Sequence, residues 1–120
     1  MQRLSATELK SQLSNFTGTC DWHKHQLTGF LYTDGVSYCA ETFGMYWFLD
    51  IIFFENKHNL LDEFQVWKLL KNVENDSCVI TADDGNDNIL FTKKIEYTDF
   101  PSESIEFYFT NNVLLLPSEN

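Results

Sequence analysis

The stretch of residues 34–55 constrains the fold of this chain more than any other segment. Its apolar residues recur at helical spacing and form one stripe, while a second apolar set covers the opposite side. A helix that is apolar all round is normally buried on more than one side. We therefore predict one central helix with other elements packed around it. One carboxylate, that of Asp50, lies inside the apolar block. The stripe consists of Val36, Cys39, Ala40, Phe43, Trp47, Ile51 and Phe54, and the opposite set of Met45, Phe48, Leu49, Ile52 and Phe53.

Glycine and capping residues predict how the helical part is divided. Gly44 lies inside the central helix, where it costs about 1 kcal/mol relative to alanine and indicates a local bend or the close approach of another backbone. Thr33 or Asp34 is the expected N-cap of that helix. Further upstream, Ser5 and Glu8 have the spacing of a capping box, which predicts a short amphipathic helix over residues 6–15 that begins with a staple between Leu4 and Leu9.

The second half of the chain has the pattern of strands separated by turns. A strong turn signal falls at residues 83–87, proline breaks the pattern at position 101, and Asn111 with Asn112 suits a tight hairpin. The order of helices and strands predicts a single α+β domain over residues 1–120. Its short N-terminal helix and central buried helix pack on a roughly five-stranded antiparallel meander. The expected strands span 64–70, 78–82, 88–97, 105–110 and 113–116.

The formal net charge is −10 and is distributed unevenly. Residues 1–73 carry eight acids and six bases, whereas residues 74–120 carry ten acids and only Lys93 and Lys94 as bases. An acidic surface repels phosphate backbones and anionic lipids, so direct binding of nucleic acid or membrane is not expected. Such a surface favours either solubility alone, as a solvated acidic face, or a basic protein partner such as a nucleic-acid-binding protein. The acidic residues expected to contact it are Glu74, Asp76, Asp83, Asp84 and Asp87.

Cysteine usage and the N-terminal residues predict the compartment. The three cysteines are an odd number without CxxC spacing, which is typical of reduced thiols in the cytoplasm. The first ten residues lack the apolar core of a signal peptide, and the apolar run at 43–54 is too short to span a bilayer. We expect a soluble cytoplasmic protein.

A series of short motifs resembles a known family along nearly the whole chain. The motifs begin with Phe16-Thr17-Gly18-Thr19 and continue through Tyr32-Thr33-Asp34-Gly35-Val36, Ala40-Glu41, Gly44-Met45-Tyr46-Trp47 with Asp50, Phe64-Gln65-Val66-Trp67, Tyr97-Thr98-Asp99-Phe100-Pro101 and Val113-Leu114-Leu115-Leu116-Pro117-Ser118-Glu119. Together they look like the landmarks of a small family of uncharacterised bacterial and phage proteins, a domain of unknown function. The resemblance implies a setting in bacterial chromosomes, prophages and other mobile elements. It supplies no catalytic residue.

Two local patterns invite a metal-binding interpretation. Cys20, His23 and His25 carry zinc-type ligands, with Cys39 or His58 as further donors, but their spacing fits no standard zinc module. The acidic turn at 83–87 lacks the glycine and glutamate positions of an EF-hand loop. We therefore expect no metal and no cofactor.

Five polar residues around the central helix form the one constellation that suggests a ligand pocket. Tyr46 and Asp50 are four residues apart on one helical face, where the phenol can hydrogen-bond the carboxylate. Buried inside the apolar block, Asp50 is a candidate general acid or base, or alternatively a satisfied structural anchor. The full set is Tyr32, Asp34, Glu41, Tyr46 and Asp50.

These observations leave three hypotheses. The first is a non-catalytic interaction protein that binds a basic partner through its acidic C-terminal half, for example as an inhibitor that imitates the charge of nucleic acid. The second is a small enzyme or ligand-binding domain that uses the pocket around Tyr32 and Asp50. The third is a homo-oligomer whose excess aromatic residues bury a subunit interface. No nucleophile elbow or phosphate-binding glycine loop is present in the sequence, so we favour the non-enzyme.

Overall fold

The N-terminal helix begins where the capping motif places it. The computed structural model describes residues 5–16, 22–59, 63–72 and 74–119. Helix α1 spans Ala6–Leu13, and the side chain of its N-cap, Ser5, accepts a hydrogen bond from the backbone N–H of Glu8 over 3.0 Å. Leu9 and Leu13 are buried and anchor the helix. Leu4, the other member of the expected staple, lies outside the described residues.

The expected central helix is in fact two helices, which corrects the prediction of one continuous rod. Helix α2 spans Asp34–Phe43 and helix α3 spans Tyr46–Asn59. Gly44 ends α2 in the left-handed conformation, with φ of 63°, and its N–H donates to Ala40. Glycine adopts this conformation without the steric cost that a side chain brings, so the residue expected to bend the helix ends it instead. Thr33 is the N-cap of α2, as expected.

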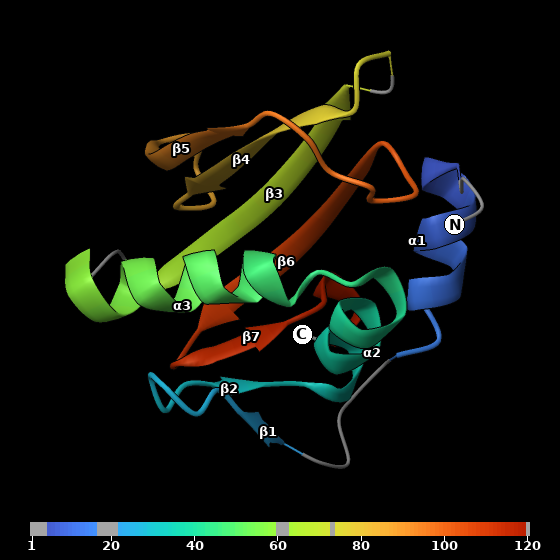
Figure 1. Cartoon of the computed structure of the whole chain (residues 1–120). Helices are drawn as coiled ribbons and strands as arrows, with labels where there is room; N and C mark the ends of the chain where they lie inside the picture. Colours follow the sequence, from blue (N-terminus) through green and yellow to red (C-terminus); the bar gives the residue numbers. More distant parts are fainter. Residues whose placement is uncertain (1–4, 17–21, 60–62, 73, 120) are drawn as a thin grey trace.

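A single sheet of seven strands in the order β1-β2-β7-β6-β3-β4-β5 forms the second layer (Figure 1). The α+β class is confirmed, but the expected five-stranded meander differs in two respects. Two short strands lie between α1 and α2 in the chain, and β2 pairs with β7 in parallel. Only β3, β4 and β5 form a meander, because the chain then crosses back so that β6 pairs with the other side of β3. The strands are β1 His23–Lys24, β2 Leu31–Tyr32, β3 Phe64–Asn72, β4 Ser77–Asp83, β5 Ile89–Ile95, β6 Ser104–Thr110 and β7 Val113–Leu115, and a 3-10 helix, η1, spans Pro117–Glu119.

The core lies between one face of the sheet and the helices. Aromatic rings of α3 pack against those of β6: the Phe48 and Phe107 centroids are 5.6 Å apart, and those of Phe53 and Phe109 are 6.2 Å apart. All four side chains are buried. Removing each such ring from water contributes about 1.5–3 kcal/mol. The alternation of β6 residues therefore places its apolar side on the helices, as its sequence pattern predicts.

A buried amide pair fixes the end of α3 against β3. Asn56 and Gln65 donate to each other's side-chain oxygens over 3.0 and 2.6 Å, and the indole N–H of Trp67 donates to Gln65 over 2.8 Å. Because an unpaired buried amide is costly, this network specifies one position of the helix along the strand.

The C-terminal residues clasp the start of α2. The carboxylate of Glu119 accepts hydrogen bonds from the Thr33 hydroxyl over 2.6 Å, the Gly35 N–H over 3.2 Å and the Leu116 N–H over 3.0 Å. A carboxylate at a helix N-terminus also interacts favourably with the positive end of the helix dipole. The clasp leaves no space at Gly35: a Cβ there would overlap Leu116 Cδ1 and lie 2.6 Å from Glu119 Oε1.

We expect Gly35→Ala to destabilise the protein by about 1–3 kcal/mol, because the new methyl group overpacks the clasp. Alanine at a helical glycine normally stabilises by about 1 kcal/mol, so the sign of the change is diagnostic. Chemical denaturation measures it. An unchanged or raised free energy of unfolding would show that Glu119 does not hold the helix start.

Candidate functional site

The expected partner-binding carboxylates lie at opposite ends of β4. Glu74 and Asp76 are in the turn between β3 and β4, whereas Asp84 and Asp87 are in the turn between β4 and β5. Asp83 is only 6% exposed and lies 3.8 Å from Lys68, and Asp84 accepts hydrogen bonds from Asn86 and Asn88. These hydrogen bonds lower the pKa of Asp84 below its usual range. The structure therefore brings together Glu74 with Asp76, and Asp84 with Asp87, but not the two pairs.

The connection from β5 to β6 adds three carboxylates to the end that carries Glu74 and Asp76. The Thr98 N–H donates to the backbone oxygen of Asp76 over 2.7 Å, and the Lys71 N–H donates to that of Glu103 over 2.8 Å. Glu96 directly follows β5, whose last residue pairs with Cys78. We call this end of the sheet the acidic end, which comprises Glu74, Asp76, Glu96, Asp99 and Glu103.

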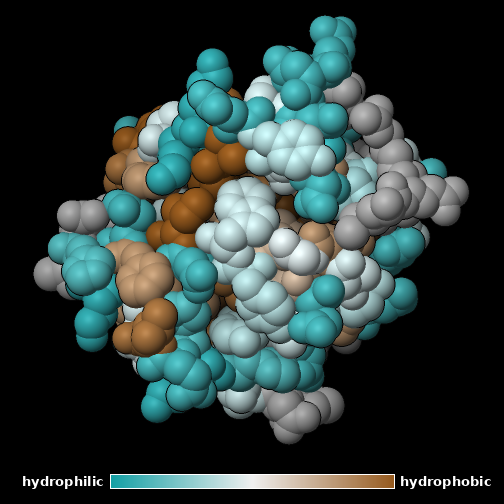
Figure 2. All heavy atoms as spheres, in the orientation of Figure 1, coloured by the Kyte–Doolittle hydropathy of each residue, from teal (hydrophilic) through white to brown (hydrophobic). Residues whose placement is uncertain are grey.

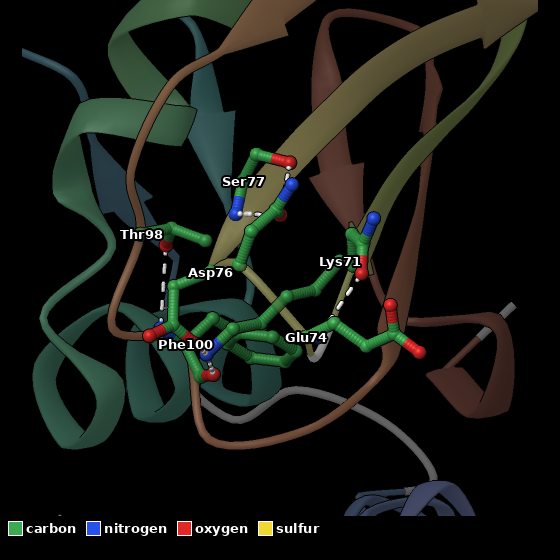
Figure 3. Close-up of polar contacts among 8 residues, drawn as sticks. Lys71, Glu74, Asp76, Ser77, Thr98 and Phe100 are labelled. Carbon is green, nitrogen blue, oxygen red and sulfur yellow. Dashed lines mark hydrogen bonds and ion pairs between the residues drawn. The ribbon is translucent and has the colours of Figure 1, made fainter.

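A buried lysine holds the acidic end together from inside (Figure 3). The Lys71 side chain is 6% exposed, and its ammonium donates to the backbone oxygen of Phe100 over 2.7 Å and lies 3.3 Å from the Asp76 carboxylate. Phe100 is buried against Phe43, so the lysine ties the crossing connection to both the turn and the core. The Asp76 carboxylate forms an ion pair with Lys71. Glu74, Glu96, Asp99 and Glu103 are exposed to solvent.

The second candidate set gathers on the face made by α2, α3 and the β1–β2 hairpin. The Tyr46 hydroxyl donates to Glu41 Oε2 over 2.9 Å, His25 Nε2 lies 2.8 Å from Asp50 Oδ1, and His23 Nε2 lies 3.0 Å from Asp34 Oδ1. The His23 ring also stacks on Tyr32. These polar and aromatic residues, Tyr32, Asp34, Glu41, Tyr46 and Asp50 with His23 and His25, are called the hairpin face.

Two expectations for the hairpin face are wrong. Asp50 is not buried: its side chain is 53% exposed. Tyr46 bonds Glu41 rather than Asp50. Both corrections follow from the break at Gly44, which starts α3 at a new rotation, turns Tyr46 and Asp50 outward, and brings Tyr46 back towards the end of α2.

Electrostatics on the hairpin face keeps the phenols protonated. Partial burial, together with the hydrogen bond to Glu41 and the negative charge of Glu41, raises the pKa of Tyr46 to about 12. Burial also raises the pKa of Tyr32, again assisted by Glu41. At neutral pH both phenols therefore keep their protons and can donate hydrogen bonds, but they do not act as bases.

Two surface hollows of about 660 and 400 Å³ have no residue of the hairpin face in their lining. The larger is lined by α1, β6 and η1, and the smaller by Trp22, Thr33, Glu119 and the turn at Asn111. Among the described residues, no three His, Cys, Asp or Glu side chains are placed to hold a metal ion. His23 and His25 each bond a different carboxylate, and Cys20 lies outside the described part of the chain.

Burial makes the described thiols poor nucleophiles. Cys39 is fully buried, and burial raises its pKa to about 12, with the Glu119 charge adding to the effect. Burial also raises the pKa of Cys78, while Lys71 opposes that change. At neutral pH the reactive thiolate form of Cys39 is therefore negligible.

Fold and charge together define a small acidic α+β protein. On its hairpin face, three carboxylates are hydrogen-bonded to histidine or tyrosine side chains. No helix in the described ranges has the length and apolar character needed to cross a bilayer. The chain belongs to a family of unknown function (DUF6876), whose model matches residues 7–120. This confirms the resemblance to a domain of unknown function. No match was found among curated proteins or among solved structures.

Sequence reasoning missed the part of the acidic end that comes from the β5–β6 connection. Glu96, Asp99 and Glu103 are about twenty to thirty residues from Glu74, and only the crossing of the chain over β3 and β4 brings them close. The available signal was the break at Thr98 to Pro101, which marked a long connection but not its path. Gln65 was missed because a buried amide in a strand gives no pattern of its own.

We expect Lys71→Met to destabilise the protein by about 1–3 kcal/mol, because it leaves Asp76 and the Phe100 carbonyl without their buried donor. Lys57→Met is the matched control. Lys57 is exposed in the last turn of α3, so the change should cost at most about 1 kcal/mol. If both variants lose the same free energy of unfolding in urea, the contacts of Lys71 with Asp76 and Phe100 do not stabilise the acidic end.

Proposed function

We propose that this protein is a non-catalytic binding protein for a basic protein partner, which it contacts through the acidic end of its sheet. The observation that carries the proposal is a pair of backbone hydrogen bonds, from the Thr98 N–H to the Asp76 oxygen and from the Lys71 N–H to the Glu103 oxygen. These bonds bring the β5–β6 connection, with its carboxylates, beside the β3–β4 turn. Lys71 neutralises one carboxylate at most and is inaccessible to a partner. The exposed carboxylates therefore form a negative field that steers and holds positive side chains.

The proposed partner is a protein that carries lysine and arginine on its surface, as nucleic-acid-binding proteins do. The acidic end would then occupy the surface on which such a partner holds phosphates. The proposed setting is the cytoplasm of a bacterium or a cell carrying a mobile element. The free, buried Cys39 and Cys78 suit a reducing compartment.

Neutralising the acidic end should weaken binding to an immobilised lysine-rich peptide. In the triple variant Glu74→Gln, Glu96→Gln, Asp99→Asn we expect affinity to fall by about tenfold or more, because three exposed charges that face the peptide are lost. Asp76 is left unchanged so that the Lys71 ion pair persists. Binding of the unmodified protein should also weaken as salt rises.

The matched control is Glu8→Gln, Glu63→Gln, Asp87→Asn, which removes the same net charge from exposed positions outside the acidic end. Its affinity should change by less than about threefold, because charges beyond a Debye length are largely screened. If both triples lose affinity equally, the interaction senses only net charge and the acidic end is not the binding surface.

The hairpin face supports a second candidate, a small-ligand site or enzyme. The specific observation in its favour is that three carboxylates, Asp34, Glu41 and Asp50, are each bonded to a histidine or tyrosine on one surface. Such pairs are typical of acid–base chemistry as well as of structural networks.

The exposed position of Asp50 makes the second candidate separable from folding. If the hairpin face is a site, Asp50→Asn should remove ligand binding or turnover while the free energy of unfolding changes by less than about 1 kcal/mol, since the Asp50 side chain is 53% exposed. Differential scanning fluorimetry against a metabolite library provides the readout. No stabilising compound, or the same compounds for both proteins, would remove this candidate.

A further inference from the structure

Strand β5 forms one edge of the sheet and leaves the side remote from β4 without a neighbouring strand in the described part of the chain. It has seven residues, whereas β1, at the opposite edge, has two. An edge of this length presents a row of backbone N–H and C=O groups that another strand can pair with.

The side chains of β5 are also unusually exposed and apolar for this surface. Ile89 is 59% exposed, and Leu90, Phe91 and Ile95 are partly exposed. Figure 2 shows apolar side chains over β5 and between β5 and α3. The partly buried Trp47 and Ile51 of α3 are part of the same layer of residues around the core.

The charge of β5 differs from that of the rest of the chain. The strand contains no carboxylate and carries Lys93 and Lys94, the only bases after residue 73. In a chain of net charge −10, two copies can therefore bring their β5 strands together without setting carboxylates of these seven residues against each other.

We propose that two copies of this protein pair through β5 in antiparallel orientation, with Thr92 on the two-fold axis. This register places Thr92 opposite Thr92, Phe91 opposite Lys93 and Leu90 opposite Lys94 of the second copy. No like charges lie directly opposite each other, the lysine stems cover apolar groups, and the Lys93 ammonium can lie over the Phe91 ring. The two sheets become one continuous sheet across the dimer.

The net charge of each copy gives the dimer a salt dependence opposite to that of the proposed partner binding. Each copy carries −10, so association works against a long-range repulsion that added salt screens. Salt should therefore strengthen the dimer and weaken binding to a basic peptide. Failure of one proposal is thus distinguishable from failure of the other.

Sedimentation equilibrium over a concentration series tests the dimer. We expect a reversible shift from 14.1 kDa to twice that mass, and a dissociation constant raised by about tenfold or more in Thr92→Lys, which sets two lysines opposite each other. Thr42→Lys adds the same charge on exposed α2 and should leave the dissociation constant within about twofold of the unmodified value. A protein that remains monomeric at about 1 mM would overturn the proposal and indicate that Lys93 and Lys94 protect a free edge.

Cross-linking tests the register itself. Directly opposite residues of an antiparallel pair have Cα atoms about 4.5–5.5 Å apart, within the range that a disulfide bridges. In a Cys20→Ser background, Thr92→Cys treated with diamide as oxidant should give a covalent dimer, each pair of thiols losing two protons and two electrons to the diamide. Thr42→Cys should not. A dimer that forms with Thr42→Cys as readily as with Thr92→Cys would contradict the proposed two-fold.

Discussion

The packing of the aromatic face of α3 on one face of the sheet is the constraint on which the rest of the structure depends. Phe48 and Phe53 contact Phe107 and Phe109, and a buried amide network around Gln65 fixes the helix along the strands. Because these groups leave water together, neither layer is stable without the other. The sheet can then tolerate a polar opposite face, where Lys68 pairs opposite Glu106 and lies near Asp83.

This division between layers determines where charge accumulates. Carboxylates excluded from the core collect in turns and in the β5–β6 connection, and the backbone hydrogen bonds between that connection and the β3–β4 turn convert scattered acids into one surface. Buried Lys71 lets them lie close by satisfying Asp76 and the Phe100 carbonyl. The hairpin face solves the same problem differently, since each of its carboxylates has a histidine or tyrosine partner. The first arrangement leaves charge available to a partner, whereas the second largely neutralises it.

The fold class could be predicted from sequence because apolar periodicity reports burial directly. Alternation in Ile105–Phe109 and the caps at Ser5 and Thr33 were readable locally and are confirmed. The break at Gly44 was ambiguous, because glycine spacing alone does not distinguish a bend from a left-handed end. The parallel pairing of β2 with β7 and the exposure of Asp50 were not predictable, since both depend on where the chain travels after that break. Of the acidic end, Glu74 and Asp76 were predicted as binding residues. Glu96, Asp99 and Glu103 were not, because the sequence does not show the path of the β5–β6 connection.

We propose that a core closed by α3 leaves the acidic end as the surface that recognises positive charge. Backbone amide chemical-shift mapping by NMR with a soluble lysine-rich peptide tests this most directly, because it locates binding residue by residue. We expect the chemical-shift changes to concentrate at residues 74–77 and 96–103. Shifts centred on Tyr32, Glu41 and Asp50, or spread equally over both ends of the sheet, would contradict this proposal.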